Sequence, residues 1–122
     1  MVGAWERGLA RALVICALTA APAAGHAVLQ RSEPRAASTL KRSPDEVRLY
    51  FSERLEPSYS TVRVVNDRDV QVDRRDNRVD RTNPLLLRAT LPPLPTGTYK
   101  VQWRVLSVDG DVTEGVFTFS IE

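Results

Sequence analysis

The feature that most constrains the fold is an apolar side chain at every second position in several short segments. The clearest case is the segment 98–106, in which Tyr99, Val101, Trp103 and Val105 alternate with polar or charged residues. Successive side chains of a strand point to opposite faces, so this spacing places the apolar residues on one face. Four further segments share the pattern: 46–52, 60–65, 85–91 and 117–121. The chain is therefore predicted to consist of half-buried β-strands.

Turn-forming residues separate these segments and limit the strand lengths. Proline, glycine, asparagine and aspartate recur at 43–45, 56–58, 83–84, 92–97 and 109–110. Short alternating strands with such spacing predict an all-β fold, a Greek-key, immunoglobulin-like antiparallel β-sandwich. We expect Trp103, Phe117 and Phe119 to pack in its core. The stretch 67–81, in which charges of both signs alternate, is expected to be a solvated loop or edge hairpin.

The N-terminus has the pattern of a secretory signal peptide. Arg7 and Arg11 precede an uncharged, mostly apolar run from 12 to 24. This run is shorter than the roughly 20 residues that a membrane-spanning helix needs. The chain is therefore predicted to be exported to the periplasm or another extracytoplasmic part of the cell envelope. No further apolar span follows, so the mature chain is expected to have no membrane span.

Two cleavage sites fit this leader. A cut after Gly25 places small residues, Ala23 and Gly25, where signal peptidase needs them, and makes His26 the first mature residue. A cut after Ala27 also fits and would leave a chain without histidine. We favour the first, with a signal peptide at 1–25 and one domain at 26–122.

Composition excludes several classes of function. The single cysteine, Cys16, lies in the leader, so the mature protein has neither disulfides nor thiolate ligands. Lys plus Arg number 17 against 15 Asp plus Glu, without a basic patch interleaved with aromatic residues, so no nucleic-acid partner is expected. A single histidine and no glycine-rich phosphate loop leave little for catalysis, and we expect that the protein is not an enzyme.

The position of the single histidine suggests a metal site. As the first mature residue, His26 would offer its α-amine and its imidazole Nδ1 together to one ion. Nitrogen donors of this kind suit Cu(II), which prefers tetragonal N,O coordination. Two more donors are needed, and the alternative that His26 merely begins a polar arm stays open.

An ordered set of motifs runs from His26 to Ile121 and resembles the CopC family of periplasmic copper-resistance proteins. These motifs are His26-Ala27, Val47-x-Leu49-x-Phe51-Ser52-Glu53, Leu91-Pro92-x-Leu94, Gly97-x-Tyr99-x-Val101-x-Trp103-Arg104-Val105-x-Ser107, Asp109-Gly110 and Gly115-x-Phe117-x-Phe119. The resemblance implies a small, cupredoxin-like Greek-key sandwich, in agreement with the strand pattern.

The resemblance also implies a set of metal ligands. The family holds Cu(II) with the N-terminal histidine, an aspartate and a second histidine two residues later, near the glutamate of the FSE motif. These positions correspond to His26, Asp109 and Glu53, while Asp111 occupies the place of the second histidine. The outcome is either a weaker Cu(II) site or none. Without a metal, Asp109-Gly110 would be a tight turn between strands, and Glu53 a surface carboxylate.

The expected function is copper binding without turnover, for sequestration or for delivery to a separate membrane copper-transport protein (CopD-like). The alternative is a metal-free sandwich that serves as an interaction module, and it is motivated by Asp111. A copper oxidase with a histidine brace would need a second histidine, which the sequence lacks.

Overall fold

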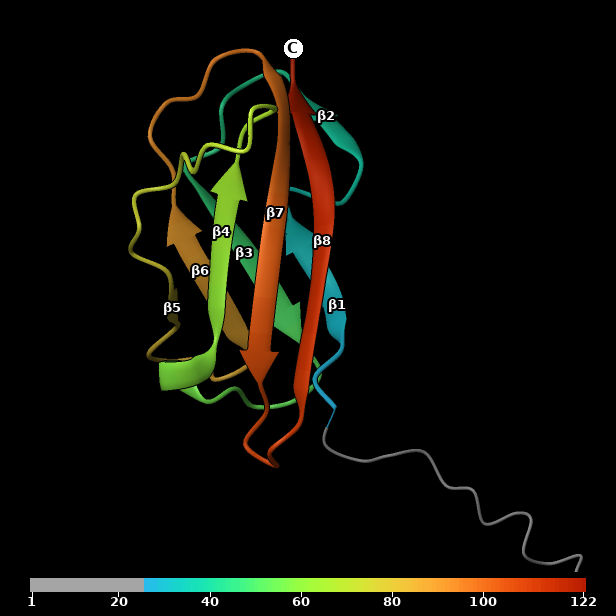
Figure 1. Cartoon of the computed structure of the whole chain (residues 1–122), viewed down its shortest axis with the longest axis vertical. Helices are drawn as coiled ribbons and strands as arrows, with labels where there is room; N and C mark the ends of the chain where they lie inside the picture. Colours follow the sequence, from blue (N-terminus) through green and yellow to red (C-terminus); the bar gives the residue numbers. More distant parts are fainter. Residues whose placement is uncertain (1–25) are drawn as a thin grey trace, which may run out of the picture.

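The computed structural model describes residues 26–122, which form two β-sheets packed face to face (Figure 1). The first sheet has the strand order β1-β3-β6-β5 and the second β2-β8-β7-β4. The strand bounds are β1 Leu29–Glu33, β2 Ser38–Leu40, β3 Glu46–Phe51, β4 Thr61–Val65, β5 Arg78–Val79, β6 Leu86–Thr90, β7 Gly97–Leu106 and β8 Val112–Ile121; a 3-10 turn, η1, spans Pro57–Tyr59. The predicted all-β sandwich is confirmed.

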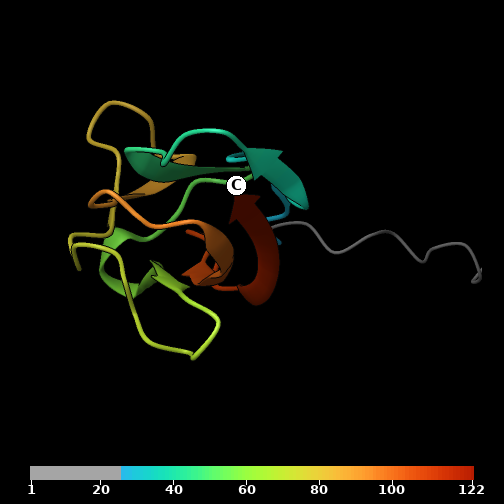
Figure 2. The same cartoon turned by 90° about the horizontal axis from the view of Figure 1, so that it is seen from above.

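The long hairpin of β7 and β8 is the main element of the second sheet. Its strands pair from Gly97↔Ile121 to Leu106↔Val112. Tyr99, Val101 and Val105 are buried, as their alternation predicts, because they face the other sheet. Seen from above, the two sheets lie one over the other, with the C-terminus at the near end (Figure 2).

The core lies between the sheets and takes apolar residues from both. Phe119 is fully buried, as expected, and stacks on Tyr99 with ring centroids 5.5 Å apart. Trp103 and Phe117 differ from expectation, because they pack against the core while remaining partly exposed. Both lie toward the open side of the sandwich, where β8 is hydrogen-bonded to β2 only along 38–40 and the first sheet ends at β1.

Two strands, β1 and β2, lie before residue 46, where the apolar alternation predicted no strand. In β1 only Ser32 is buried, so the strand lacks the apolar alternation that identifies a half-buried strand. The short strand β2 runs parallel to β8, which makes the second sheet mixed rather than purely antiparallel. Such short edge strands carry little sequence signal, because pairing with a neighbouring strand supports them more than burial does.

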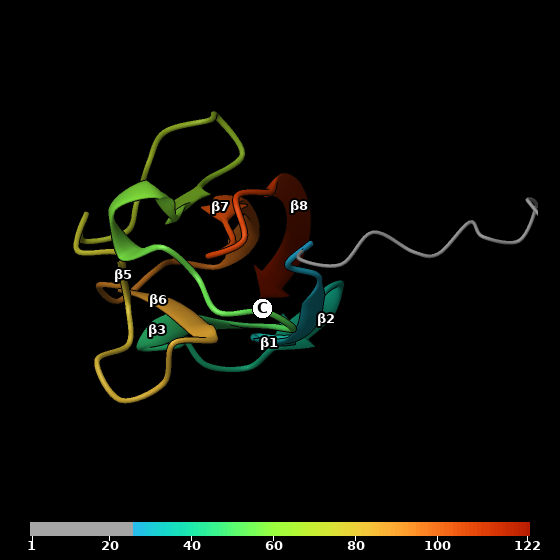
Figure 3. The same ribbon diagram turned by 90° about the horizontal axis from the view of Figure 1, so that it is seen from below.

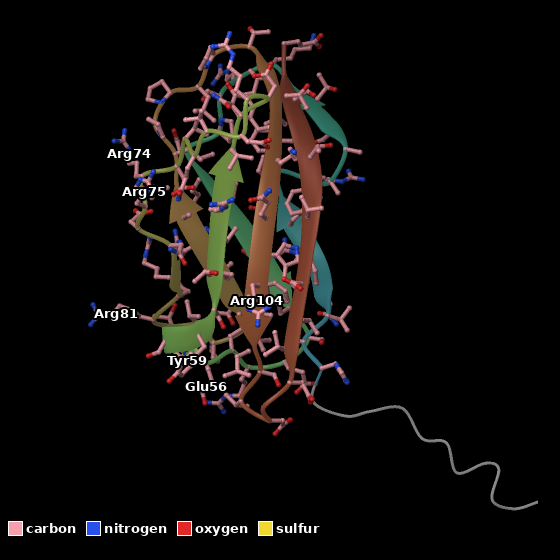
Figure 4. The ribbon with its side chains drawn as sticks, in the orientation of Figure 1. Glu56, Tyr59, Arg74, Arg75, Arg81 and Arg104 are labelled. Atoms are coloured by element: carbon pink, nitrogen blue, oxygen red, sulfur yellow. The ribbon has the colours of Figure 1, made fainter. Side chains whose placement is uncertain are left out.

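The charged stretch 67–81 forms a loop and the two-residue edge strand β5. Arg74, Arg75 and Arg81 point outward along this side of the molecule (Figure 4). The expectation of a solvated segment is wrong at Asp73, whose carboxylate is buried and accepts hydrogen bonds from the backbone N–H groups of Val64 and Arg75, both at 2.8 Å. The carboxylate is drawn inward because β4 is an edge strand, and its free N–H groups need acceptors.

Candidate metal centre

Three segments that are distant in sequence meet at one end of the sandwich. They are the N-terminal arm, defined as residues 26–28, the segment 52–56 after β3, and the β7–β8 loop at 107–111. Figure 3 shows this end from below, with the arm beginning beside the loop. Each candidate ligand lies on one of these segments.

Hydrogen bonds fix the N-terminal arm in place. The Val28 N–H donates to the Ser52 Oγ at 2.9 Å, and the Ser52 N–H donates to the Val28 carbonyl, also at 2.9 Å. The Thr113 hydroxyl donates to the Ala27 carbonyl at 2.9 Å. The Ala27 side chain is buried in the core, while His26 is exposed. The backbone of the arm is therefore anchored, while the imidazole of His26 remains accessible.

The β7–β8 loop is a tight turn closed by Ser107 and Asp111. The Ser107 N–H donates to the Asp111 carbonyl at 2.9 Å, and the Gly110 N–H donates to the Ser107 carbonyl at 2.9 Å. Gly110 has a φ of 94°, a conformation that favours glycine in short hairpin loops. The predicted turn at Asp109-Gly110 is thus confirmed. Asp109 is exposed at the tip, and Asp111 is half-buried at the base.

The segment after β3 joins the arm to this loop. Ser52 contacts the arm, and the Arg54 carbonyl accepts a hydrogen bond of 3.0 Å from the Val108 N–H in the loop. Leu55 also forms an isolated β-bridge with Ser107. Glu53, half-buried, follows Ser52 directly and therefore lies between the arm and the loop. All four candidate ligands are placed at the same end of the domain.

The candidate side chains do not form a preassembled metal cluster. Among residues 26–122, no group of three or more His, Cys, Asp or Glu side chains is arranged to hold an ion. The chain also carries Gly25 before His26, so the α-nitrogen of His26 is a peptide nitrogen here. The assignment of His26, Glu53, Asp109 and Asp111 as ligands therefore stays a prediction.

The donor types nevertheless fit one oxidation state of copper. Imidazole nitrogen and carboxylate oxygen suit Cu(II), whereas Cu(I) prefers thiolate and thioether sulfur. The single cysteine and the single methionine, Cys16 and Met1, both precede residue 26. A domain of residues 26–122 thus offers copper nitrogen and oxygen donors without sulfur.

Sequence reasoning missed the residues that hold the arm. Ser52 belongs to the FSE motif, but the pattern gave its hydroxyl no role. Thr113 lies 86 positions from its partner Ala27, and no local pattern links them. Only the folded topology brings the two together.

The sequence model of the CopC domain matches residues 29–122, so the chain belongs to the CopC domain family. The match begins after the arm and leaves His26 outside it. Protein YobA of Escherichia coli K12 is 31% identical over 98 residues, which cover 80% of this chain and 79% of YobA. Copper resistance protein C of Xanthomonas campestris pv. juglandis is 29% identical over 116 residues, covering 90% of this chain and 91% of that protein.

The same domain also occurs within a longer relative. The copper transport protein CutJ of Bacillus subtilis is 31% identical over 97 residues, which cover 79% of this chain but 18% of CutJ. Within residues 26–122, no helix is long and apolar enough to cross a membrane.

Solved structures agree with the fold. CopC from Methylosinus trichosporium OB3b superimposes with a TM-score of 0.73 at 30% identity, covering 80% of this chain and 94% of that one. The methionine-rich copper resistance protein PcoC from Escherichia coli gives a TM-score of 0.67 at 28% identity, covering 80% and 99%.

Proposed function

We propose that this chain is an exported Cu(II)-binding protein that sequesters the ion, or delivers it to a separate membrane copper-transport protein, in copper resistance and homeostasis. The observation that carries the proposal is the anchoring of the arm beside the β7–β8 loop. Through Thr113 and Ser52, it keeps His26 at the same end as Asp109 and Asp111. Relatives named for copper resistance and copper transport support the same ion.

In the proposed site the first donors come from a single residue. A mature N-terminal His26 presents an amine and an imidazole Nδ1 that can chelate one Cu(II) ion. Asp109 and Asp111 supply carboxylate oxygens from the loop, and Glu53 adds negative charge nearby. Because Asp111 replaces a nitrogen donor with oxygen, we expect weaker Cu(II) binding than a site with two histidines would give. Copper is the cargo, and no turnover is proposed.

Export and cleavage after Gly25 are part of the proposal, and the predicted signal peptide at 1–25 lies outside the described residues. The environment of Ala27 supports this cut over the one after Ala27. Its side chain is only 1% exposed, and its carbonyl accepts the Thr113 hydrogen bond. Cleavage after Ala27 would remove this residue from the folded domain, and both contacts would be lost with it. The intact mass of protein isolated from the periplasm should equal that of a chain that begins at His26.

The proposal is tested by titrating protein that begins at His26 with Cu(II) in a calorimeter. We expect saturable 1:1 binding that His26→Ala weakens strongly and Asp109→Asn weakens moderately. Asp67→Asn, in the exposed turn after β4, is the matched control and should bind as the unmodified protein does. Trp103, the single tryptophan after the leader, gives an independent fluorescence readout.

The absence of saturable binding in this titration would overturn the proposal. It would favour the metal-free interaction module, which is already motivated by Asp111 and by the absence of a three-ligand cluster among residues 26–122. Binding that survives His26→Ala unchanged would move the site elsewhere on the domain.

A further inference from the structure

Among the strands of the described residues 26–122, none pairs regularly with the N-terminal arm. Regular pairing of the first sheet begins after it, at Leu29↔Phe51, and the register shifts between Leu29 and Arg31. Residues 26–28 therefore depend on other contacts for a fixed position. An exposed terminal segment without such contacts is ordinarily poorly ordered.

Thr113 supplies one contact from the opposite sheet. It pairs with the buried Val105, and its side chain lies on the inner face of β8. Its hydroxyl reaches the Ala27 carbonyl at 2.9 Å, although the chain after Ala27 continues into the first sheet. This hydrogen bond therefore joins the two sheets at the end where His26 lies.

Ser52 supplies the other contact from the end of β3. Its hydroxyl accepts from the Val28 N–H, and its own N–H donates to the Val28 carbonyl, both at 2.9 Å. The same hydroxyl lies 3.4 Å from the His26 carbonyl oxygen. Together with the buried Ala27 methyl group, these contacts fix the backbone of residues 26–28.

We infer that Thr113 and Ser52 are positioning residues: they hold the arm so that residue 26 is presented to the β7–β8 loop, without contacting a metal ion themselves. This positioning operates in the metal-free protein. Its consequence for copper rests on the proposed function, because a donor already held in place loses less freedom when it binds.

The test uses protein that begins at His26 and the variant Thr113→Val, which removes the hydroxyl at nearly unchanged volume. Without metal, we expect amide hydrogen exchange at Val28 and Ser52 to become about tenfold faster, which corresponds to 1.4 kcal/mol of local stability. Cu(II) affinity should fall by a similar factor. Thr113→Ser should restore both values, since it returns the hydroxyl.

Thr98→Val is the matched control. Thr98 lies at the other end of the same hairpin, and its hydroxyl pairs with the Ser120 hydroxyl at 3.0 Å. Its loss should change neither the exchange at Val28 nor the Cu(II) affinity. Ser52→Ala tests the second anchor and also keeps the inference testable if Thr113→Val does not fold.

The outcomes separate this inference from the proposed function. Unchanged exchange at Val28 in both Thr113→Val and Ser52→Ala would overturn the positioning role, whatever copper does. Faster exchange in a protein that never binds copper would support the positioning role and refute the proposed function. Faster exchange with unaltered Cu(II) affinity would refute the effect on the metal site.

Discussion

The indole ring of Trp103 covers Gly115, its cross-strand partner on β8. A methyl group placed on Gly115 would lie 2.5 Å from the indole Cζ2. The same ring meets Phe51 of the first sheet edge-on, with centroids 5.0 Å apart. Trp103 thus bridges the two sheets at the open side, and the absence of a side chain at Gly115 allows it to do so.

Gly115→Ala should therefore destabilise the domain, because the indole must move away from the new methyl group and its edge-on contact with Phe51 is disturbed. We expect the free energy of unfolding in urea to fall by about 1–3 kcal/mol and the Trp103 emission to shift. Val116→Ala, at an outward position on the same strand that is 58% exposed, is the control and should change stability by less than about 0.5 kcal/mol. An unchanged urea midpoint for Gly115→Ala would contradict this packing.

Asp73→Ala should also be destabilising, although it lies in a loop rich in charge. The substitution removes the acceptor for the Val64 and Arg75 N–H groups and leaves a buried donor unsatisfied. The expected loss is about 1–3 kcal/mol in urea unfolding. Asp67→Ala, an exposed aspartate near the start of the same loop, should have little effect. Equal effects of the two substitutions on stability would show that Asp73 is as solvated as Asp67.

Asp80 should make stability depend on pH in the acid range. Hydrogen bonds from Thr82 and Arg88 lower the pKa of its carboxyl to about 2. An unfolded chain has an aspartate pKa of about 3.9, so the folded state favours the ionised form. The stabilisation is complete above about pH 4 and is lost as the pH falls toward 2.

Asp80→Asn tests this pH dependence. The variant should be less stable than the unmodified protein at pH 7, and the difference should shrink as the pH falls from about 4 to about 2. Urea midpoints measured across this range check it, with Asp67→Asn as the control. A stability difference that stays constant through this range would contradict the role of Asp80.

Much of the fold could be predicted because the core strands follow one physical rule. Residues of β3, β4 and β7 alternate between the core and solvent. The apolar residue at every second position in the sequence predicts this alternation directly. The rule failed where a strand pairs with its neighbour but does not bury one face and expose the other. At β1 and β2 the backbone pairs at an edge without apolar alternation. In β6, alternation with Leu85 and Leu87 predicts that Leu86 faces outward, yet Leu86 is buried.

The candidate site was less predictable for a different reason. The turn at Asp109-Gly110 is a local property and could be inferred from two residues. The anchoring of Ala27 by Thr113 depends on how the two sheets meet, which no local pattern encodes. Sequence alone could therefore indicate the candidate copper ligands but not what holds the arm beside them.

Asp111→His should strengthen the proposed site, because it adds an imidazole donor that suits Cu(II) better than a carboxylate. We expect affinity to rise by at least about tenfold, or 1.4 kcal/mol, in competition titrations with a chelator. Asp67→His, remote from the arm, controls for an added surface histidine. If both variants gain equally, the β7–β8 loop is not part of the site.

The central claim is that the chain-terminal amine of His26 binds the ion together with its own imidazole. The most direct measurement compares Cu(II) affinity for protein that begins at His26 with the same protein acetylated only at its α-amine. The acetyl group leaves every side chain in place, turns the His26 α-nitrogen into an amide nitrogen and adds no new terminal amine. We predict saturable 1:1 binding that weakens by at least about a hundredfold, or 2.7 kcal/mol, when the amine is acetylated. Equal affinity of the two proteins would contradict the account.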